Sequence, residues 1–177
     1  TAKDITFWVE KIEDAAQESA DWAEAALRGR RYYHGHQWDD GDLIEEAERI
    51  QITNNVIQPD INQMVARVLD SDPVIDTHGR GAEDFQLGDL WRDLLRWSEE
   101  WTGYEFESCW DVRRKCFMDT YQTGEGIEKT WWCPHEEGGL GMVVSEWIDP
   151  LEMLWDPEAR TAQKLDARWV IHMRPVP

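Results

Sequence analysis

The stretch GEGIEKTWWCPHEEGGLGMVVSEWI, residues 124–148, decides the fold class of this chain. Upstream of it the apolar residues recur with the period of a helix, whereas residues 127–133 and 142–148 are rich in β-branched and aromatic side chains. Segment 134–141 between them contains the proline and glycines that are typical of a turn. The stretch therefore predicts a long β-hairpin.

Downstream of the hairpin the sequence predicts a bend and a third strand. The bend lies in LEMLWDPEA, residues 151–159. The strand lies in DARWVIHM, residues 166–173, where apolar and β-branched residues gather again. The third strand would complete a small antiparallel sheet.

Upstream of the hairpin the pattern predicts helices. A long amphipathic helix is expected over residues 6–28, ending near Gly29, because apolar residues such as Trp8 recur there at helical spacing among acidic ones. Asn55, with Gln58 three residues later, is typical of a helix N-terminal cap. This helix would end before the Asp72-Pro73 pair. The other expected helices cover residues 42–49, 83–101 and 104–122.

These elements predict one α+β domain, with long N-terminal amphipathic helices over residues 1–123 and a small antiparallel sheet over residues 124–177. A chain of 177 residues, of which 41% are hydrophobic, can bury a real core. It begins with Thr1 and stops at MRPVP, just after the third strand, where we expect a domain to continue. We therefore expect the N-terminal part of a longer polypeptide.

The net charge of −19 argues against a nucleic-acid-binding face, because affinity for phosphates comes from clustered Lys and Arg. The dense basic patch of Arg28, Arg30 and Arg31 is interpreted as cations placed favourably at a helix C-terminus. No apolar window of about 18 residues and no signal-peptide pattern is present, so we expect no membrane segment. The three cysteines lack disulfide-framework spacing and fit a reducing compartment.

The candidate metal ligands do not have the spacing of a structural zinc site. The best set is Cys109, Cys116, Cys133 and His135, which lacks CxxC pairing. Cys109 and Cys116 are two helical turns apart and are better interpreted as small buried residues on one helix face. His34 and His36 have no third ligand nearby. Carboxylates are too numerous to identify an acid–base couple, and phosphate-loop, nucleophile-elbow and dinucleotide motifs are missing, so we expect no enzyme, metal or cofactor.

Two aromatic clusters leave the class of function open. The segment YYHGHQW, residues 32–38, is compatible with a sugar site, a metal site or a structural corner around Gly35. Trp91, Trp97 and Trp101 could form a carbohydrate platform, although their helical spacing is more typical of a core or a subunit interface. Twelve tryptophans favour burial on assembly. The alternative to a structural protein is a small acidic carbohydrate- or metal-binding module.

The order of several segments resembles the N-terminal, wing-region part of tailed-phage portal proteins of the podovirus type. An acidic helix is followed by YYHGHQW, then by NNVIQPDINQMVARVLDSDP, EWIDPLEMLWDPEA and DARWVIHM, so that the resemblance spans nearly the whole chain. The matching residues are Tyr33, Gly35, Gln37, Trp38, Asn55, Ile57, Asp149, Pro150, Trp155, Asp156, Pro157, Ala167, Arg168, Trp169 and Val170.

The resemblance implies a structural protein of the virion, typically a dodecamer, at one vertex of a bacteriophage capsid. Its ring would form the channel for viral genome packaging and DNA ejection and would act as head–tail connector. It would contact the capsid protein, the terminase large subunit and tail or head-completion proteins, after assembly in the host cytoplasm. An acidic surface would let DNA pass without sticking. Channel-lining and terminase-docking residues would lie beyond Pro177.

Under this interpretation, residues 32–38 form a corner between helices. Gly35 would supply the backbone bend, Tyr33 and Trp38 would pack on either side, and Gln37 would bond to local backbone groups. Without the stem and clip of such proteins, we expect this chain alone to be a monomer or a weak small oligomer. The candidate subunit-interface residues, near the edges of their helical stripes, are Trp8, Trp22 and Trp97.

Overall fold

A computed structural model describes residues 2–38, 52–70, 76–77, 81, 84–100, 107–161 and 164–174 of the chain. These residues form an α+β fold, as predicted, with the helices first and the strands last. The helices are α1 (Ala2–Glu18), α2 (Ala20–Tyr33), α4 (Ile57–Asp70), α5 (Phe85–Glu100) and α6 (Cys109–Thr123). The strands are β1 (Ile127–Cys133), β2 (Met142–Ile148), β3 (Met153–Trp155) and β4 (Val170–His172), with short 3-10 turns at Glu137–Gly139 and Pro150–Glu152.

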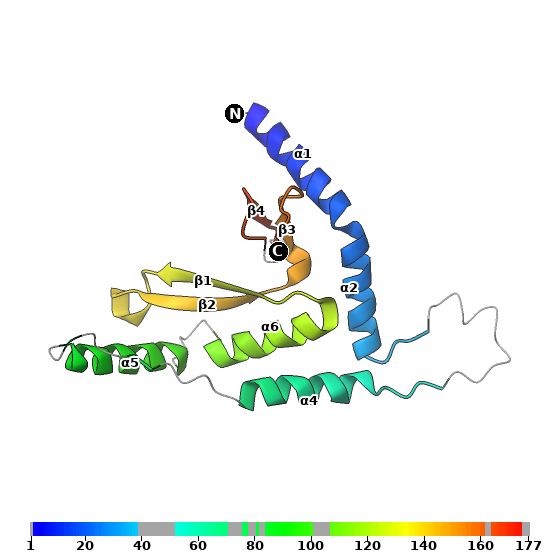
Figure 1. Cartoon of the computed structure of the whole chain (residues 1–177). Helices are drawn as coiled ribbons and strands as arrows, with labels where there is room; N and C mark the ends of the chain where they lie inside the picture. Colours follow the sequence, from blue (N-terminus) through cyan, green and yellow to red (C-terminus); the bar gives the residue numbers. More distant parts are fainter. Residues whose placement is uncertain are drawn as a thin grey trace.

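Helix α6 is the centre of the fold. The β1–β2 hairpin lies along one side of it, α4 lies along the other, and α2 crosses its C-terminal end (Figure 1). Val112 on α6 is completely buried, and Val65 of α4 and Val144 and Ile148 of β2 are buried as well. One apolar face of the hairpin and the apolar stripes of two helices thus share a single core.

The β1–β2 hairpin has the predicted strands and the predicted turn. It is antiparallel, and its register runs from Ile127 opposite Ile148 to Cys133 opposite Met142, which leaves residues 134–141 as the turn. Gly141 ends the turn at φ +83°, and a Cβ there would overlap the ring of Trp132. Glycine is therefore required at this position both by the backbone and by the neighbouring ring.

The third strand does not extend the hairpin, which corrects the prediction of one small sheet. Strand β4 pairs with β3, a three-residue strand inside the segment expected to be a bend, and these two form a second antiparallel sheet. Leu154 of β3 lies opposite Ile171 of β4 and is buried. The expected strand over residues 166–173 shortens to three residues because β3 offers only three partners.

The prediction of one helix over residues 6–28 was wrong about its continuity and about its C-terminal end. The helical region divides at Ser19 into α1 and α2, and Figure 1 shows the bend between them. Helix α2 also continues through Gly29 to Tyr33. A Cβ on Gly29 would overlap the carbonyl oxygen of Gln122 at the end of α6. Gly29 therefore allows two helices to approach closely instead of ending one of them.

The remaining helix predictions are confirmed with shifted ends where the structure describes them. Helix α4 follows Asn55, whose Oδ1 accepts the backbone N–H of Gln58 at 3.2 Å. Helix α6 starts after Ser108, whose Oγ accepts the N–H of Asp111. The expected helix over residues 42–49 and the run of residues 101–106 lie outside the described residues. Among the described helices, none combines the length and the apolarity that a membrane crossing needs.

Candidate functional site

The corner at residues 32–38 joins α2 to the start of α4. Gly35 has φ +82°, in the left-handed region that favours glycine. The Nδ2 group of Asn55 donates to the carbonyl oxygen of Tyr33 at 2.8 Å, while its Oδ1 caps α4. The buried Tyr33 donates from its hydroxyl to Oδ1 of Asn62 at 2.8 Å. Asn55 and Tyr33 together connect the end of one helix to the start of the next.

The rest of the aromatic segment lies on the surface of this corner. The indole Nε1 of Trp38 donates to Oγ1 of Thr53 at 3.1 Å, and the Trp38 side chain is exposed. The N–H of Gln37 donates to the carbonyl oxygen of Gly35 at 3.0 Å. His34 stacks edge-on against Tyr33. These contacts have the character of a structural corner.

A second junction forms around the guanidinium of Arg30, on the last turn of α2. Its Nη1 and Nη2 each donate to one carboxylate oxygen of Asp149, both at 2.8 Å. The same Nη2 donates to Oδ1 of Asp119 on α6 at 3.0 Å. The other oxygen of Asp119 accepts the indole N–H of Trp147 on β2 at 2.6 Å. One cation therefore connects α2, α6 and the segment that leaves the hairpin.

Burial affects the two carboxylates of this junction differently. It raises the pKa of Asp119 above its ordinary value, although Trp147 and Arg30 both donate to this carboxylate. Burial also opposes ionisation of Asp149, but the hydrogen bonds from Arg30 and from the N–H of Leu151 outweigh it and hold the pKa of Asp149 below its ordinary value. The bidentate Arg30–Asp149 pair is thus the strong interaction, and Asp119 shares its cation.

A third junction joins the two sequence segments WDP and ARW. Asp156 is buried, and its carboxylate accepts the Nε of Arg168 at 2.8 Å and the backbone N–H of Glu158 at 3.1 Å. Its own N–H donates to the carbonyl oxygen of Trp169 at 3.3 Å. The hydrogen bonds from Arg168 lower the pKa of Asp156 to about 2. Asp156 therefore stays ionised and fastens the loop between β3 and β4.

The neighbouring Trp155 packs against the same loop. The ammonium of Lys164 lies 5.3 Å above its ring and also pairs with Glu125 at 3.2 Å. Among the described atoms, its indole Nε1 is buried without a hydrogen-bond partner. Trp155 also lines a cavity of about 290 Å³ together with Trp22 and Met153. Of the three candidate interface tryptophans, Trp22 is thus half-buried in its own subunit, whereas Trp8 and Trp97 are exposed.

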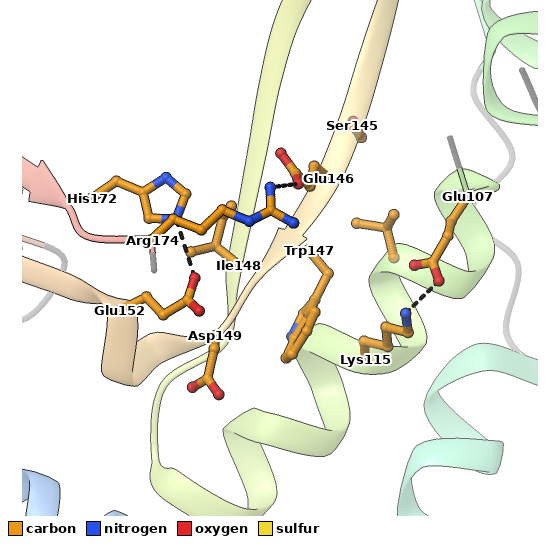
Figure 2. A pocket seen from close by; sticks show the side chains of 11 residues that line it. Glu107, Lys115, Ser145, Glu146, Trp147, Ile148, Asp149, Glu152, His172 and Arg174 are labelled. Carbon is orange, nitrogen blue, oxygen red and sulfur yellow. Dashed lines mark hydrogen bonds and ion pairs between the residues drawn. The ribbon is translucent and has the colours of Figure 1, made fainter. Parts of the chain in front are cut away.

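A larger hollow of about 530 Å³ lies between β2, β4 and α6 (Figure 2). Its charged side chains face one another in pairs. His172 pairs with Glu152 at 3.3 Å, and Arg174 pairs with Glu146 at 3.1 Å. The third pair, also drawn in Figure 2, is Lys115 with Glu107. Asp149, which also lines the hollow, is held by Arg30, so each acidic side chain of the lining has a basic partner.

The cysteines are all reduced and half-buried. The Sγ of Cys116 donates to the carbonyl oxygen of Ile127 at 3.2 Å, and burial raises the pKa of this thiol to about 11. In the part of the chain that the structure describes, no three His, Cys, Asp or Glu side chains come together as a metal site would require.

Sequence reasoning missed the centre of the second junction. Asp149 belonged to a motif, but Arg30 was interpreted only as part of a basic patch, and Asp119 and Trp147 were not singled out. The available signal was the pair Gly29-Arg30 on a helix that is otherwise rich in alanine. Gly29 lets α6 approach α2 closely, and Arg30 beside it reaches the Asp119 carboxylate on α6.

The family model described as phage P22-like portal protein matches residues 9–177, so it includes all three junctions. No curated protein matches the chain.

Proposed function

This chain belongs to the phage P22-like portal protein family, and we propose that it works as a subunit of the ring that forms the portal at one vertex of a phage capsid. The observation that carries the proposal is the match over residues 9–177, which includes nearly every described helix and strand. The members of this family are structural proteins. Membership implies that this chain is part of the virion and assembles into an oligomeric ring.

The finer features of the role follow from the sequence resemblance. We propose a ring of typically twelve copies that encloses the channel for genome packaging and ejection. Its partners are the capsid protein, the terminase large subunit and tail or head-completion proteins. The net charge of −19 supports passage of DNA without tight binding, because the surface offers few cations to replace the counterions of the phosphates.

Within the subunit, the three junctions hold the elements in fixed orientations. The corner contributes Tyr33, Gly35, Gln37, Trp38 and Asn55, and the segments around the other two junctions contribute Asp149, Pro150, Trp155, Asp156, Pro157 and Trp169. Each junction joins segments distant in sequence through hydrogen bonds to a charged or buried group. Such contacts limit the relative motion of these elements within the subunit.

Assembly of the intact gene product tests this function. Size-exclusion chromatography with light scattering gives the mass, and negative-stain electron microscopy gives the shape. We expect a closed ring with a central opening. A protein that remains monomeric at micromolar concentration and shows no ring would contradict the proposal.

A further inference from the structure

Helix α5 carries an apolar stripe that the described residues of the chain leave exposed. The stripe consists of Leu87, Leu90, Trp91 and Leu94, at the spacing of one helix face, and these side chains are between 48% and 63% exposed. Helix α5 contacts α6 near its C-terminal end, where the Sγ of Cys109 donates to the carbonyl oxygen of Ser98. Elsewhere on α5, Gly88 is buried and Leu95 is half-buried. The apolar surface of α5 is therefore wider than the contact with α6 can cover.

The stripe is large for a surface exposed to water. With about half of each large side chain accessible, it presents on the order of 400 Å² of apolar surface. Patches of this size on soluble proteins are often functional. It is also about half of the roughly 800 Å² that each partner contributes to a stable interface, so that one such contact alone would be weak. A ring adds contacts at every subunit boundary and closes on itself.

Helix α1 carries a second exposed stripe at the opposite end of the molecule. Ile5, Trp8 and Val9 are exposed, whereas Ala15 on the same helix is buried where α1 approaches β3. Figure 1 shows the first half of α1 projecting beyond the rest of the fold. The apolar stripe thus continues past the part of the subunit that covers it.

We propose that the α5 stripe of one subunit packs against the projecting α1 stripe of the next subunit. A ring needs two different surfaces on each copy, because a surface that binds itself closes a dimer. The hairpin turn and α4, which also carry exposed apolar side chains, lie nearer to α5 in Figure 1, whereas α1 projects at the far end. This contact presupposes the ring proposed above and names the surfaces that form it.

Charge substitutions in the intact gene product provide the first test. Leu90→Glu places a carboxylate in the centre of the α5 stripe, and we expect the ring to be lost. The matched control is Leu165→Glu, in the loop between β3 and β4, because Leu165 is 81% exposed and lies outside both stripes. The control keeps the ring. Neither substitution should change the far-UV circular dichroism spectrum, since neither side chain is buried, so that loss of the ring in Leu90→Glu is not loss of the fold.

Disulfide cross-linking provides the second test and identifies the partner. The double variant Leu90→Cys with Trp8→Cys, under mild oxidation, gives a ladder of covalent multimers, whereas each single variant and the wild-type background give none. Dimers from Leu90→Cys alone would indicate a self-complementary contact and overturn the proposal. A cross-link within one chain would show that α5 is covered by its own subunit and would also overturn it.

The two tests separate this inference from the proposed function. If the wild type forms rings but Leu90→Glu forms them equally well and the double variant gives no ladder, the α5–α1 contact is wrong and the portal function stands. If the wild type forms no ring, both fail.

Discussion

Replacing Arg30 by alanine should strongly destabilise the fold, because it removes the cation shared by two carboxylates. Three hydrogen bonds of 2.8 to 3.0 Å are lost. Asp119 and Asp149 then remain close together with no cation between them. Asp119 has only 9% of its side chain exposed, so water cannot replace the missing donor.

The size of the expected destabilisation depends on how exposed the side chains of the Arg30 junction are. Removing one partner of a fully buried ion pair costs roughly 3–5 kcal/mol. Arg30 and Asp149 keep 22% and 25% of their side chains exposed, so water partly solvates the Asp149 carboxylate once the partner is gone. We therefore expect the free energy of unfolding to fall by about 2–4 kcal/mol. With a slope of about 2 kcal/mol/M, the urea midpoint moves down by about 1–2 M.

Urea unfolding followed by tryptophan fluorescence measures this change, and Trp147 lies within the junction. The matched control is Arg28→Ala, two residues away on the same helix. Arg28 pairs with Glu24 at 3.8 Å, and both side chains are largely exposed. Its loss should change the free energy of unfolding by less than about 0.5 kcal/mol. If Arg30→Ala is no more destabilising than Arg28→Ala, the reasoning about the junction is refuted.

Three further predictions concern single residues. Gly29→Ala should lower the free energy of unfolding in urea by about 1–3 kcal/mol, because the new methyl group meets Gln122. The same change at an open helix position raises it by about 1 kcal/mol. A stabilised variant would show that α2 and α6 do not touch at this position. Iodoacetamide at pH 8 should alkylate Cys116 on the order of 100-fold more slowly in the folded protein than in urea, because its pKa of about 11 leaves little thiolate. Peptide mass spectrometry measures both rates. Equal rates would show that the fold does not suppress the thiolate. Asp156, with a folded-state pKa of about 2 against an ordinary 3.8, contributes stability that is complete above about pH 4 and lost as the pH falls towards 2, because the unfolded chain takes up the proton first. The melting temperature of the wild type should therefore fall more steeply between about pH 4 and pH 2 than that of Asp156→Asn. Parallel dependence of the two melting temperatures on pH would contradict this role of Asp156.

Local signals in the sequence were sufficient for the hairpin and for the helix caps. Segments rich in β-branched and aromatic residues on both sides of a glycine-containing turn predict a hairpin because all the partners lie within one short segment. Asn55 caps α4 through a residue three positions away, which is equally local. The aromatic residues around Gly35 left a sugar site, a metal site and a structural corner open. The corner followed only from the family resemblance, and its hydrogen bonds to Asn55 and Asn62 needed the fold.

Features that depend on distant partners were missed or misplaced. Gly29 was interpreted by the local rule that glycine ends helices, but its role depends on Gln122 on another helix. Arg30 binds carboxylates that are 89 and 119 positions further along the sequence. Helical or strand periodicity gives no information about contacts at such sequence separations. Strand β4 was assigned to the hairpin sheet because pairing between strands across a long loop cannot be read from alternation.

The most direct test of the proposed portal function is an asymmetric cryo-electron microscopy reconstruction of the phage that encodes this chain. We expect a ring at one capsid vertex whose repeating unit accommodates α6 with the β1–β2 hairpin on one side and α4 on the other. We also expect this arrangement to repeat around the axis of the ring. Density at that vertex that cannot contain this arrangement would show that the chain does not form the portal ring.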